Sequence, residues 1–219
     1  DENNKIVAKA SRKTNVPRAA ELIFDDMAAA VKDAMSQIHI TNDDLISVGV
    51  GTPGSVNKAE GLIEFANNLG FDNLPAYKLL KDRLGFDKVY FDNDANCAAL
   101  GEAVAGCGKG VKDFIMITLG TGVGSGIVIN GEVVYGHDGF AGELGHTTSP
   151  VLEGRACGCG RTDCLETYAS ATGIVRTAKK WLVERDTPSS LRDICMNELT
   201  SKMLFDAAMQ GDKLALEIF

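Results

Sequence analysis

Segments with the length and composition of strands alternate with helical segments over the first half of this 219-residue chain, and this alternation constrains the fold more than any other feature. In the first helical segment, apolar side chains recur at steps of three and four residues, and Pro17 suits the first turn. Strands that alternate with helices are typical of the α/β class and predict a largely parallel sheet. In chain order the segments are residues 17–38 (helix), 46–50 (strand), 76–84 (helix), 88–91 (strand) and 94–105 (helix).

A glycine-rich segment, Gly106–Gly110, follows these elements and is typical of a hinge. We therefore expect two α/β domains, one over residues 1–106 and one over residues 107–219. Asn130-Gly131 predicts a hairpin turn in the second domain. Its expected elements are three strands at residues 114–119, 125–129 and 132–135, then helices at residues 168–185 and 201–210.

Composition excludes several classes of protein. The formal net charge is −8 and there are no basic clusters, so we expect no nucleic-acid partner. Apolar runs fall well short of the roughly 20 residues of a membrane helix, so we expect no membrane partner. There are six cysteines but no visible signal peptide, which favours a reducing, cytoplasmic compartment.

Both ends of the chain have the character of cut ends. Residues 6–10 are strand-like and follow a turn-like start at Asp1, which predicts a hairpin whose first strand lies upstream. The apolar segment that ends at Phe219 has no capping signal. We therefore expect this chain to be a piece of a longer protein.

The most specific pattern in the chain joins one histidine to three cysteines: His146, Cys157, Cys159 and Cys164. Such a set in a short, glycine-containing loop suits a closed, tetrahedral zinc site of structural type. The alternative is a small disulfide beside a surface histidine. A disulfide between Cys157 and Cys159, which are separated by one residue, would be strained, and this favours zinc.

A polar run, Asp92–Asn96, lies where a predicted strand ends and a helix begins. Ligands usually bind at this edge of an α/β sheet, and a carboxylate there is stabilised as the anion. Helix capping explains one such polar residue equally well. From the residues alone, both interpretations of the run stay open.

Glycine occupies every second position from Gly120 to Gly126. Such spacing lets backbone N–H groups approach a phosphate, but a strand follows where a dinucleotide-binding fingerprint requires a helix. The Gly-Lys-Ser/Thr of a P-loop is also absent. A plain hairpin turn and a hairpin that holds phosphates therefore both remain possible.

Two glutamates stand beside the predicted metal loop. Glu143 precedes His146 by three residues, and Glu166 follows Cys164 by two. A metal-bound loop would hold both carboxylates at fixed positions. Either glutamate taken singly is more often a solvated surface residue.

The segment Gly-His…Cys-x-Cys-Gly…Cys-Leu-Glu, with the other motifs in this order, resembles the ROK family of bacterial sugar kinases, N-acylmannosamine kinases and sugar-responsive repressors. The resemblance covers nearly the whole chain, is clearest from Gly51 to Glu166, and is closest to the ATP-dependent glucokinases. It implies the actin-like, ribonuclease-H-like ATPase fold, with two α/β domains around a cleft and a zinc-bound loop.

Residue roles follow from the resemblance. Asp94 resembles the catalytic base that takes the proton of the sugar's 6-hydroxyl, and His146 resembles a group that contacts both the sugar and the zinc. The implied sugar-binding residues are Gly54, Asn68, Asn93, Asp94, Glu143, His146 and Glu166, of which the first two match more loosely. The residues implied to hold the ATP phosphates are Gly120, Thr121, Gly122 and Gly124, with Mg²⁺ as a further cofactor.

The implied function is ATP-dependent phosphorylation of a hexose, most similar to glucose conversion into glucose 6-phosphate, by an enzyme that forms homodimers. The alternatives are a sugar-sensing repressor domain and an N-acylmannosamine kinase. The family's N-terminal Asp-x-Gly-Gly-Thr loop and its C-terminal adenosine segment have no match in the chain. We therefore expect the parent protein to be a kinase and this piece alone to be inactive.

Overall fold

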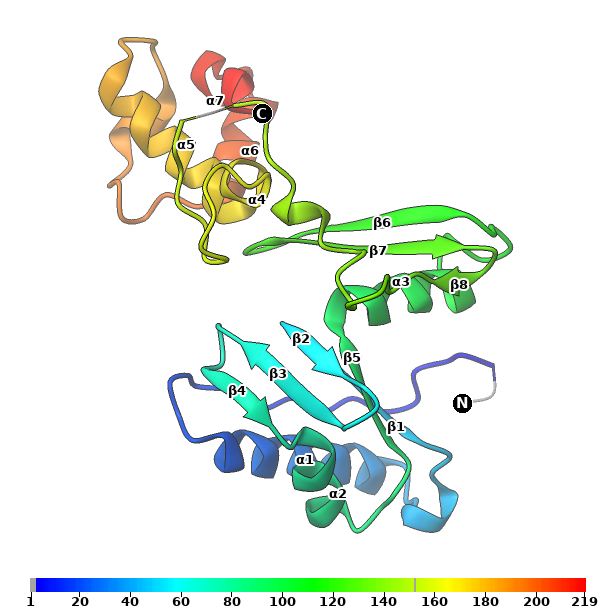
Figure 1. Ribbon diagram of the computed structural model, residues 1–219. Coiled ribbons are helices and arrows are strands. Elements are labelled where there is room, and N and C mark those ends of the chain that lie inside the picture. The colour runs from blue at the N-terminus through cyan, green and yellow to red at the C-terminus, as the bar shows by residue number, and fades with distance from the viewer. Residues whose placement is uncertain (1–2, 152) are drawn as a thin grey trace. The chain divides into compact units, whose positions relative to one another are not determined.

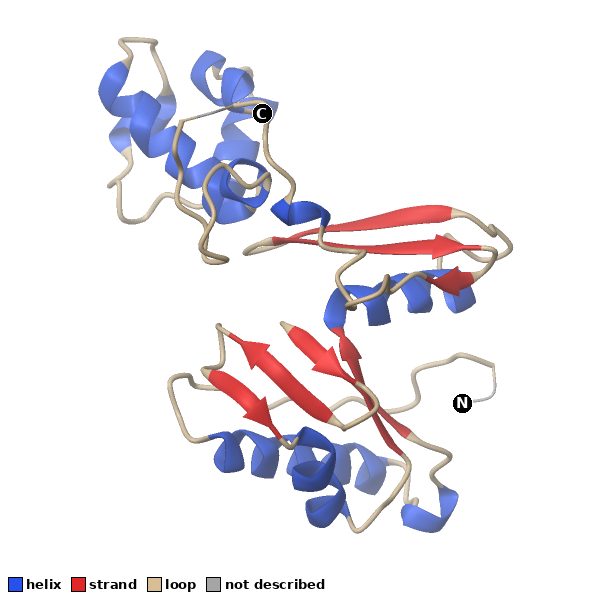
Figure 2. Ribbon diagram, in the orientation of Figure 1, coloured by secondary structure: helices blue, strands red, loops and turns tan. Residues whose placement is uncertain are grey.

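Helices and strands occur in both halves of the protein, so the expected mixed α/β class is confirmed (Figure 2). The structure is a computed structural model that describes residues 3–151 and 153–219 (Figure 1). Its contacts divide it into two compact units, and β6 and β7 each run from one unit into the other. The first unit is the chain up to Phe114 with Gly126–Phe140, and the second is Ile115–Ser125 with Ala141–Phe219.

Two sheets lie in the first unit. One is the parallel pair of β1 and β5, in which Val50 is the partner of Phe91. The other is an antiparallel sheet in the order β2-β3-β4, whose strands are joined by turns too short for a parallel crossover. The bounds are β1 (Val48–Thr52), β2 (Ser55–Asn57), β3 (Leu62–Ala66), β4 (Phe71–Leu74) and β5 (Val89–Asn93).

The prediction of a largely parallel sheet is therefore wrong for the described residues. Among their recorded strand pairings, β1 with β5 is parallel, whereas the β2-β3-β4 pairs and β7 with β8 are antiparallel. Alternation of strands and helices reveals the class of fold, but not which strands become neighbours.

Aromatic side chains form the core of the first unit. α1 (Ala20–Gln37) and α2 (Ala76–Leu84) supply Phe24 and Leu80, which are 0% and 1% exposed. The ring of Phe24 lies 6.3 Å from the rings of both Phe71 and Phe91, measured between centroids. This core holds the carboxyl end of β5, where the predicted catalytic turn begins.

α3 (Asp94–Ala105) starts directly after β5 and packs closely on β7 (Val123–Ile129). A methyl group built on Gly126 would lie 2.4 Å from Cβ of Ala99, so glycine permits this approach. β7 pairs with β8 (Glu132–Val133) through the Asn130-Gly131 turn, where both residues have positive φ, as a hairpin turn requires. β6 (Phe114–Leu119) completes a sheet in the order β6-β7-β8.

Short helices build the second unit, and Leu191, Leu204 and Leu214 are buried among them. The predicted single helix over residues 168–185 is two helices, because the backbone turns out of helical geometry at Ser170, whose hydroxyl caps the second of them. These helices are α4 (Glu166–Ala169), α5 (Ala171–Glu184), α6 (Ser201–Met209) and α7 (Lys213–Ile218).

One N-terminal expectation is corrected and another stays a prediction. Residues 6–10 pair with no strand in the described part of the chain, and their expected partner lies upstream of Asp1, so the hairpin stays a prediction. Pro17 lies before α1 instead of in its first turn, because the helix begins at Ala20. None of the helices described has both the length and the apolar composition that crossing a bilayer requires.

Candidate functional site

The turn between β5 and α3 carries Asn93 and Asp94. The Asn93 side chain caps α3, because its Oδ1 accepts hydrogen bonds from the N–H groups of Ala95 (2.9 Å) and Asn96 (3.2 Å). Asp94 is the first residue of the helix and is exposed. The positive end of the helix dipole stabilises its carboxylate, which solvent and ligands can reach. The structure thus contains the cap and leaves a carboxylate beside it that can accept a proton.

Gly54 is brought to this turn, since its carbonyl oxygen accepts a hydrogen bond from Nδ2 of Asn93 at 3.2 Å. Its φ is +87°, and a methyl group there would lie 1.9 Å from the carbonyl oxygen of Phe65, so the position requires glycine. Asn68 lies elsewhere, in the exposed turn between β3 and β4.

A cluster that sequence analysis missed surrounds Asp92, the residue before Asn93. Oδ2 of Asp92 lies 2.5 Å from Nζ of Lys58 and 2.8 Å from the hydroxyl of Tyr135. Burial opposes the charge on Lys58, but the hydrogen bonds to Asp92 and Tyr135 outweigh it and raise its pKa. Burial also raises the pKa of Tyr135. No spacing rule connects these three distant positions. The sequence therefore identified only Asp92 as a candidate, because it lies inside the polar run.

The structure brings together the four predicted metal-binding residues. Their ligand atoms all lie within 4.8 Å of one another. Sγ of Cys159 lies 3.6 Å from Sγ of Cys164, and Sγ of Cys157 lies 3.6 Å from Nδ1 of His146. These sulfurs are too far apart for a disulfide, and all the cysteines in the described residues are free. The donor set could hold a metal ion.

The cysteines of this set differ in their affinity for protons. Burial opposes the Cys159 thiolate, but hydrogen bonds from the backbone and side chain of Arg161 outweigh it and lower the pKa to about 6. Burial and the neighbouring thiols raise the pKa of Cys164 to about 12.

Asp163 organises the loop that carries these ligands. Its carboxylate accepts hydrogen bonds from the N–H groups of Gly154 (3.0 Å) and Arg155 (2.9 Å) and from the hydroxyl of Tyr168 (2.5 Å). The bond from Tyr168 is the main cause of its lowered pKa. Arg155 is 4% exposed, and its guanidinium lies 4.1 Å from the centroid of the Tyr168 ring. Contacts within the protein thus support the backbone of the loop that carries the cysteines.

Glu143, His146 and Glu166 form a connected group beside the loop. Nε2 of His146 lies 3.8 Å from Oε2 of Glu143, while its Nδ1 faces Cys157. Oε1 of Glu166 lies 3.9 Å from Sγ of Cys157, and Oε2 accepts a hydrogen bond from N–H of Val123 at 2.9 Å. Nδ1 of His146 therefore faces the cysteine cluster, and Nε2 faces the carboxylate of Glu143.

The glycine-rich hairpin between β6 and β7 is tied to the first turn of α5. N–H of Ala171 donates to the carbonyl oxygen of Gly120 at 2.9 Å, and the hydroxyl of Thr172 donates to that of Thr121 at 2.8 Å. Gly122 faces Glu166, and a methyl group built on it would lie 2.2 Å from Oε2 of that residue. Gly124 lies within β7.

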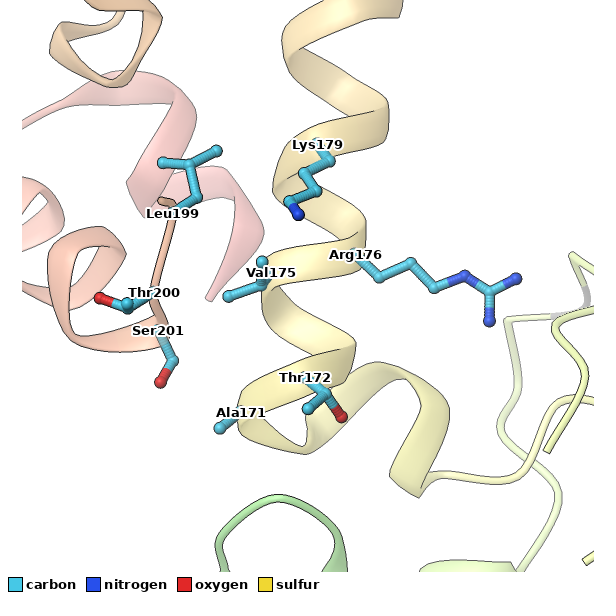
Figure 3. Close-up of a pocket in the computed structure, with 8 residues that line it drawn as sticks. All are labelled: Ala171, Thr172, Val175, Arg176, Lys179, Leu199, Thr200 and Ser201. Atoms are coloured by element: carbon cyan, nitrogen blue, oxygen red, sulfur yellow. The ribbon is translucent and has the colours of Figure 1, made fainter. Parts of the chain in front are cut away.

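A pocket of about 580 Å³ lies between α5 and the start of α6 (Figure 3). Its lining includes the cationic residues Arg176 and Lys179 and an apolar wall with Val175 and Leu199, and the Arg176 guanidinium points away from Leu199 (Figure 3). Thr172 lines the pocket and also bonds to the hairpin, so the two are neighbours. Sequence analysis missed the pocket, whose lining residues are Ala171, Thr172, Val175, Arg176, Lys179, Leu199, Thr200 and Ser201.

Comparison with known proteins places this chain in a family. The model of the ROK family matches residues 1–219. The chain belongs to the ROK family. The resemblance inferred from the motifs between Gly51 and Glu166 is thereby confirmed.

The relatives of this ROK chain include enzymes and regulators. A glucokinase from Halalkalibacterium halodurans is 42% identical over 97% of the chain and 64% of its own length. A xylose repressor from Caldicellulosiruptor bescii is 33% identical over 88% of the chain and 47% of its own length.

Among solved structures, a ROK glucokinase from Streptomyces griseus in complex with glucose and AMPPNP matches with a TM-score of 0.80 and 36% identity. That match covers 100% of this chain and 68% of the solved one. The chain therefore spans about two thirds of the glucokinases that it resembles, and the expected similarity to glucokinases is confirmed.

Proposed function

We propose that this ROK chain is the larger part of an ATP-dependent sugar kinase that phosphorylates glucose at its 6-hydroxyl. The observation that carries the proposal is the exposed Asp94 carboxylate at the start of α3, in a chain 42% identical to a glucokinase. Phosphoryl transfer depends on positioning and charge stabilisation more than on covalent chemistry, and this turn supplies the positioned base.

Asp94 accepts the proton of the 6-hydroxyl in this proposal. Asp94 is exposed at the N-terminus of α3, where the helix dipole stabilises negative charge. Asn93 holds the turn in place through its capping bonds and its bond to Gly54. The oxygen of the hydroxyl then attacks the γ-phosphorus in line with the departing ADP.

Glu143, His146 and Glu166 are proposed to hydrogen-bond the ring hydroxyls of the sugar. Carboxylates accept from two hydroxyls at once, and the imidazole Nε2 is turned toward Glu143, away from the cysteines. Groups arranged in this way penalise a sugar that lacks the matching hydroxyl.

The donor ATP is proposed to place its phosphates at Gly120, Thr121, Gly122 and Gly124 and its nucleoside in the pocket between α5 and α6. The pocket adjoins the hairpin through Thr172, and its apolar wall, which includes Val175 and Leu199, suits the base of a nucleoside. Mg²⁺ would supply neutralisation of the phosphate charge when bound with ATP.

We further propose that His146, Cys157, Cys159 and Cys164 hold a structural zinc ion. Ligands about 2.3 Å from a tetrahedral centre lie about 3.8 Å apart, close to the recorded separations of 3.6 Å. A cation would also stabilise the Cys164 thiolate, which is otherwise unfavourable. Bound zinc would fix Nδ1 of His146 and so orient Nε2 toward the sugar.

Sugar-dependent ADP release by the full-length protein tests the kinase proposal. Glucose, N-acetylmannosamine and no sugar are compared, with Asp94→Asn as the matched variant that keeps the shape of the side chain. We expect turnover with glucose, and a loss of at least about 100-fold in the variant. The homodimer stays a prediction, which sedimentation of the same preparation measures.

A sugar-sensing regulator is the second candidate, favoured by the similarity to a xylose repressor over 88% of the chain. A regulator would bind sugar without releasing ADP. Calorimetric titration with glucose and xylose beside the turnover assay separates the two functions, because binding without turnover excludes the kinase.

A further inference from the structure

The Asp92 cluster joins three parts of the first unit that are distant in sequence. Lys58 follows β2, Asp92 lies in β5, and Tyr135 follows β8. The Asp92 side chain is 19% exposed, against 43% for Lys58. Nζ of Lys58 lies 3.4 Å from the centroid of the Tyr135 ring, so the cation contacts both partners. All three groups therefore restrain one another.

The two oxygens of Asp92 have different partners. Oδ2 accepts from both Lys58 and Tyr135, whereas Oδ1 accepts from the backbone N–H of Asn93 at 2.8 Å. The carboxylate thus connects the cluster to the backbone of the β5–α3 turn. β2 is fastened to this turn at both of its ends, through Gly54 before the strand to Asn93 and through Lys58 after the strand to Asp92.

We propose that Asp92 is a positioning residue that, held by Lys58 and Tyr135, fixes the turn on which Asn93 and Asp94 stand. The inference rests on the proposed function for its catalytic consequence. Asp92 acts through the N–H of Asn93, whose side chain in turn caps α3 at Ala95 and Asn96. Displacement of a catalytic group by about 1 Å lowers the rate on the order of 100-fold. Contacts that hold this turn in place would therefore preserve the rate of phosphoryl transfer.

Asp92→Asn is the discriminating variant. An asparagine has the same shape but only one acceptor oxygen, so it can accept either from Asn93 or from Lys58 and Tyr135, never from both sides. The chain offers a matched control in Asp87→Asn. Asp87 pairs with Lys81 at 2.7 Å, and Lys81 also lies over an aromatic ring, at 5.6 Å from the centroid of Tyr77.

Two measurements on the full-length protein test the proposal. The first is steady-state kinetics of glucose phosphorylation, in which Asp92→Asn is expected to lower kcat about tenfold or more and to change the glucose KM less than threefold. The second is amide hydrogen exchange at Ala95 and Asn96, which is expected to become at least about tenfold faster. Asp87→Asn is expected to change each quantity less than twofold.

An Asp92→Asn protein whose kcat stays within threefold of wild type overturns the proposal, and so does unchanged exchange at Ala95 and Asn96. If Asp92→Asn does not fold, Tyr135→Phe, which removes one hydroxyl, is judged by the same two measurements with a threefold threshold. If the wild-type protein shows no sugar-dependent turnover, the proposed function fails, and the exchange rates alone then decide whether Asp92 positions the turn.

Discussion

Replacement of Gly122 by alanine tests whether one carboxylate serves both the sugar and the glycine-rich hairpin. The added methyl group would lie 2.2 Å from Oε2 of Glu166 and 3.1 Å from its Cδ. Carbon and oxygen atoms in contact lie about 3.3 Å apart, so the carboxylate must move by about 1 Å. That movement breaks its 2.9 Å hydrogen bond from N–H of Val123.

The size of the effect follows from the hydrogen bond to the sugar that the displaced Glu166 carboxylate would no longer make. A hydrogen bond to a charged group contributes about 1.5–3 kcal/mol, which corresponds to a factor of about 10 to 150 in an equilibrium constant. Because Glu166 is proposed to bind the sugar, we expect the dissociation constant of glucose to rise by a factor in this range.

Calorimetric titration of glucose into the full-length Gly122→Ala protein measures this constant directly, and circular dichroism verifies that the variant folds. Gly49→Ala is the control, because a methyl group built on Gly49 has no atom within 4 Å. A folded Gly122→Ala protein that binds glucose within twofold of wild type would show that Glu166 does not carry the sugar site, or that it moves without cost.

Three further predictions concern the second unit. Cys164→Ser is expected to remove most of the zinc that mass spectrometry finds in the wild-type protein, and equal zinc in both would contradict the proposed ligand set. Leu204→Ala, at a side chain 0% exposed, is expected to lower the free energy of unfolding by about 3 kcal/mol in denaturant titrations, whereas Met209→Ala, at 72% exposure, changes it by less than about 0.5 kcal/mol. Asp212→Asn is expected to lower the free energy of unfolding by about 1 kcal/mol. Burial raises the pKa of Asp212, but hydrogen bonds from Ala215 and the Ser189-Ser190 turn outweigh this effect and lower the pKa. The stabilisation by ionised Asp212 is complete above the ordinary aspartate pKa of about 3.9 and is lost as the pH falls through the lower pKa of the folded state. The unfolding free energies of wild type and variant are therefore expected to become equal at low pH.

Local signals predicted a good part of this fold. The helices Ala76–Leu84 and Asp94–Ala105 and the strand Phe114–Leu119 have the predicted bounds, because apolar spacing and a capping residue act within one segment. The four metal-binding candidates were predicted for the same reason, since their short loop carries both ligands and glycines. The break at Ser170 was missed, although serine is a favoured cap.

Other features depend on contacts between distant segments, and no local pattern reveals them. The antiparallel β2-β3-β4 sheet depends on which strands pair with each other. The Asp92 cluster likewise depends on contacts among residues 58, 92 and 135. The crowding of Gly122 by Glu166 spans 43 positions along the chain. Sequence patterns therefore identified both residues but not the contact between them.

The hydrogen bonds that fasten the hairpin to α5 also determine how the backbone carbonyl dipoles of the hairpin are oriented. The carbonyl oxygens of Gly120 and Thr121 accept from α5, and that of Gly122 accepts from N–H of Gly120 at 3.0 Å. Three successive dipoles thus have their negative ends engaged by the protein itself. If the hairpin holds the phosphates of ATP as proposed, the anion would meet less repulsion from such a loop, and no carbonyl would have to turn away when it binds. The orientation of these carbonyls is set by the fold itself, before any ligand arrives.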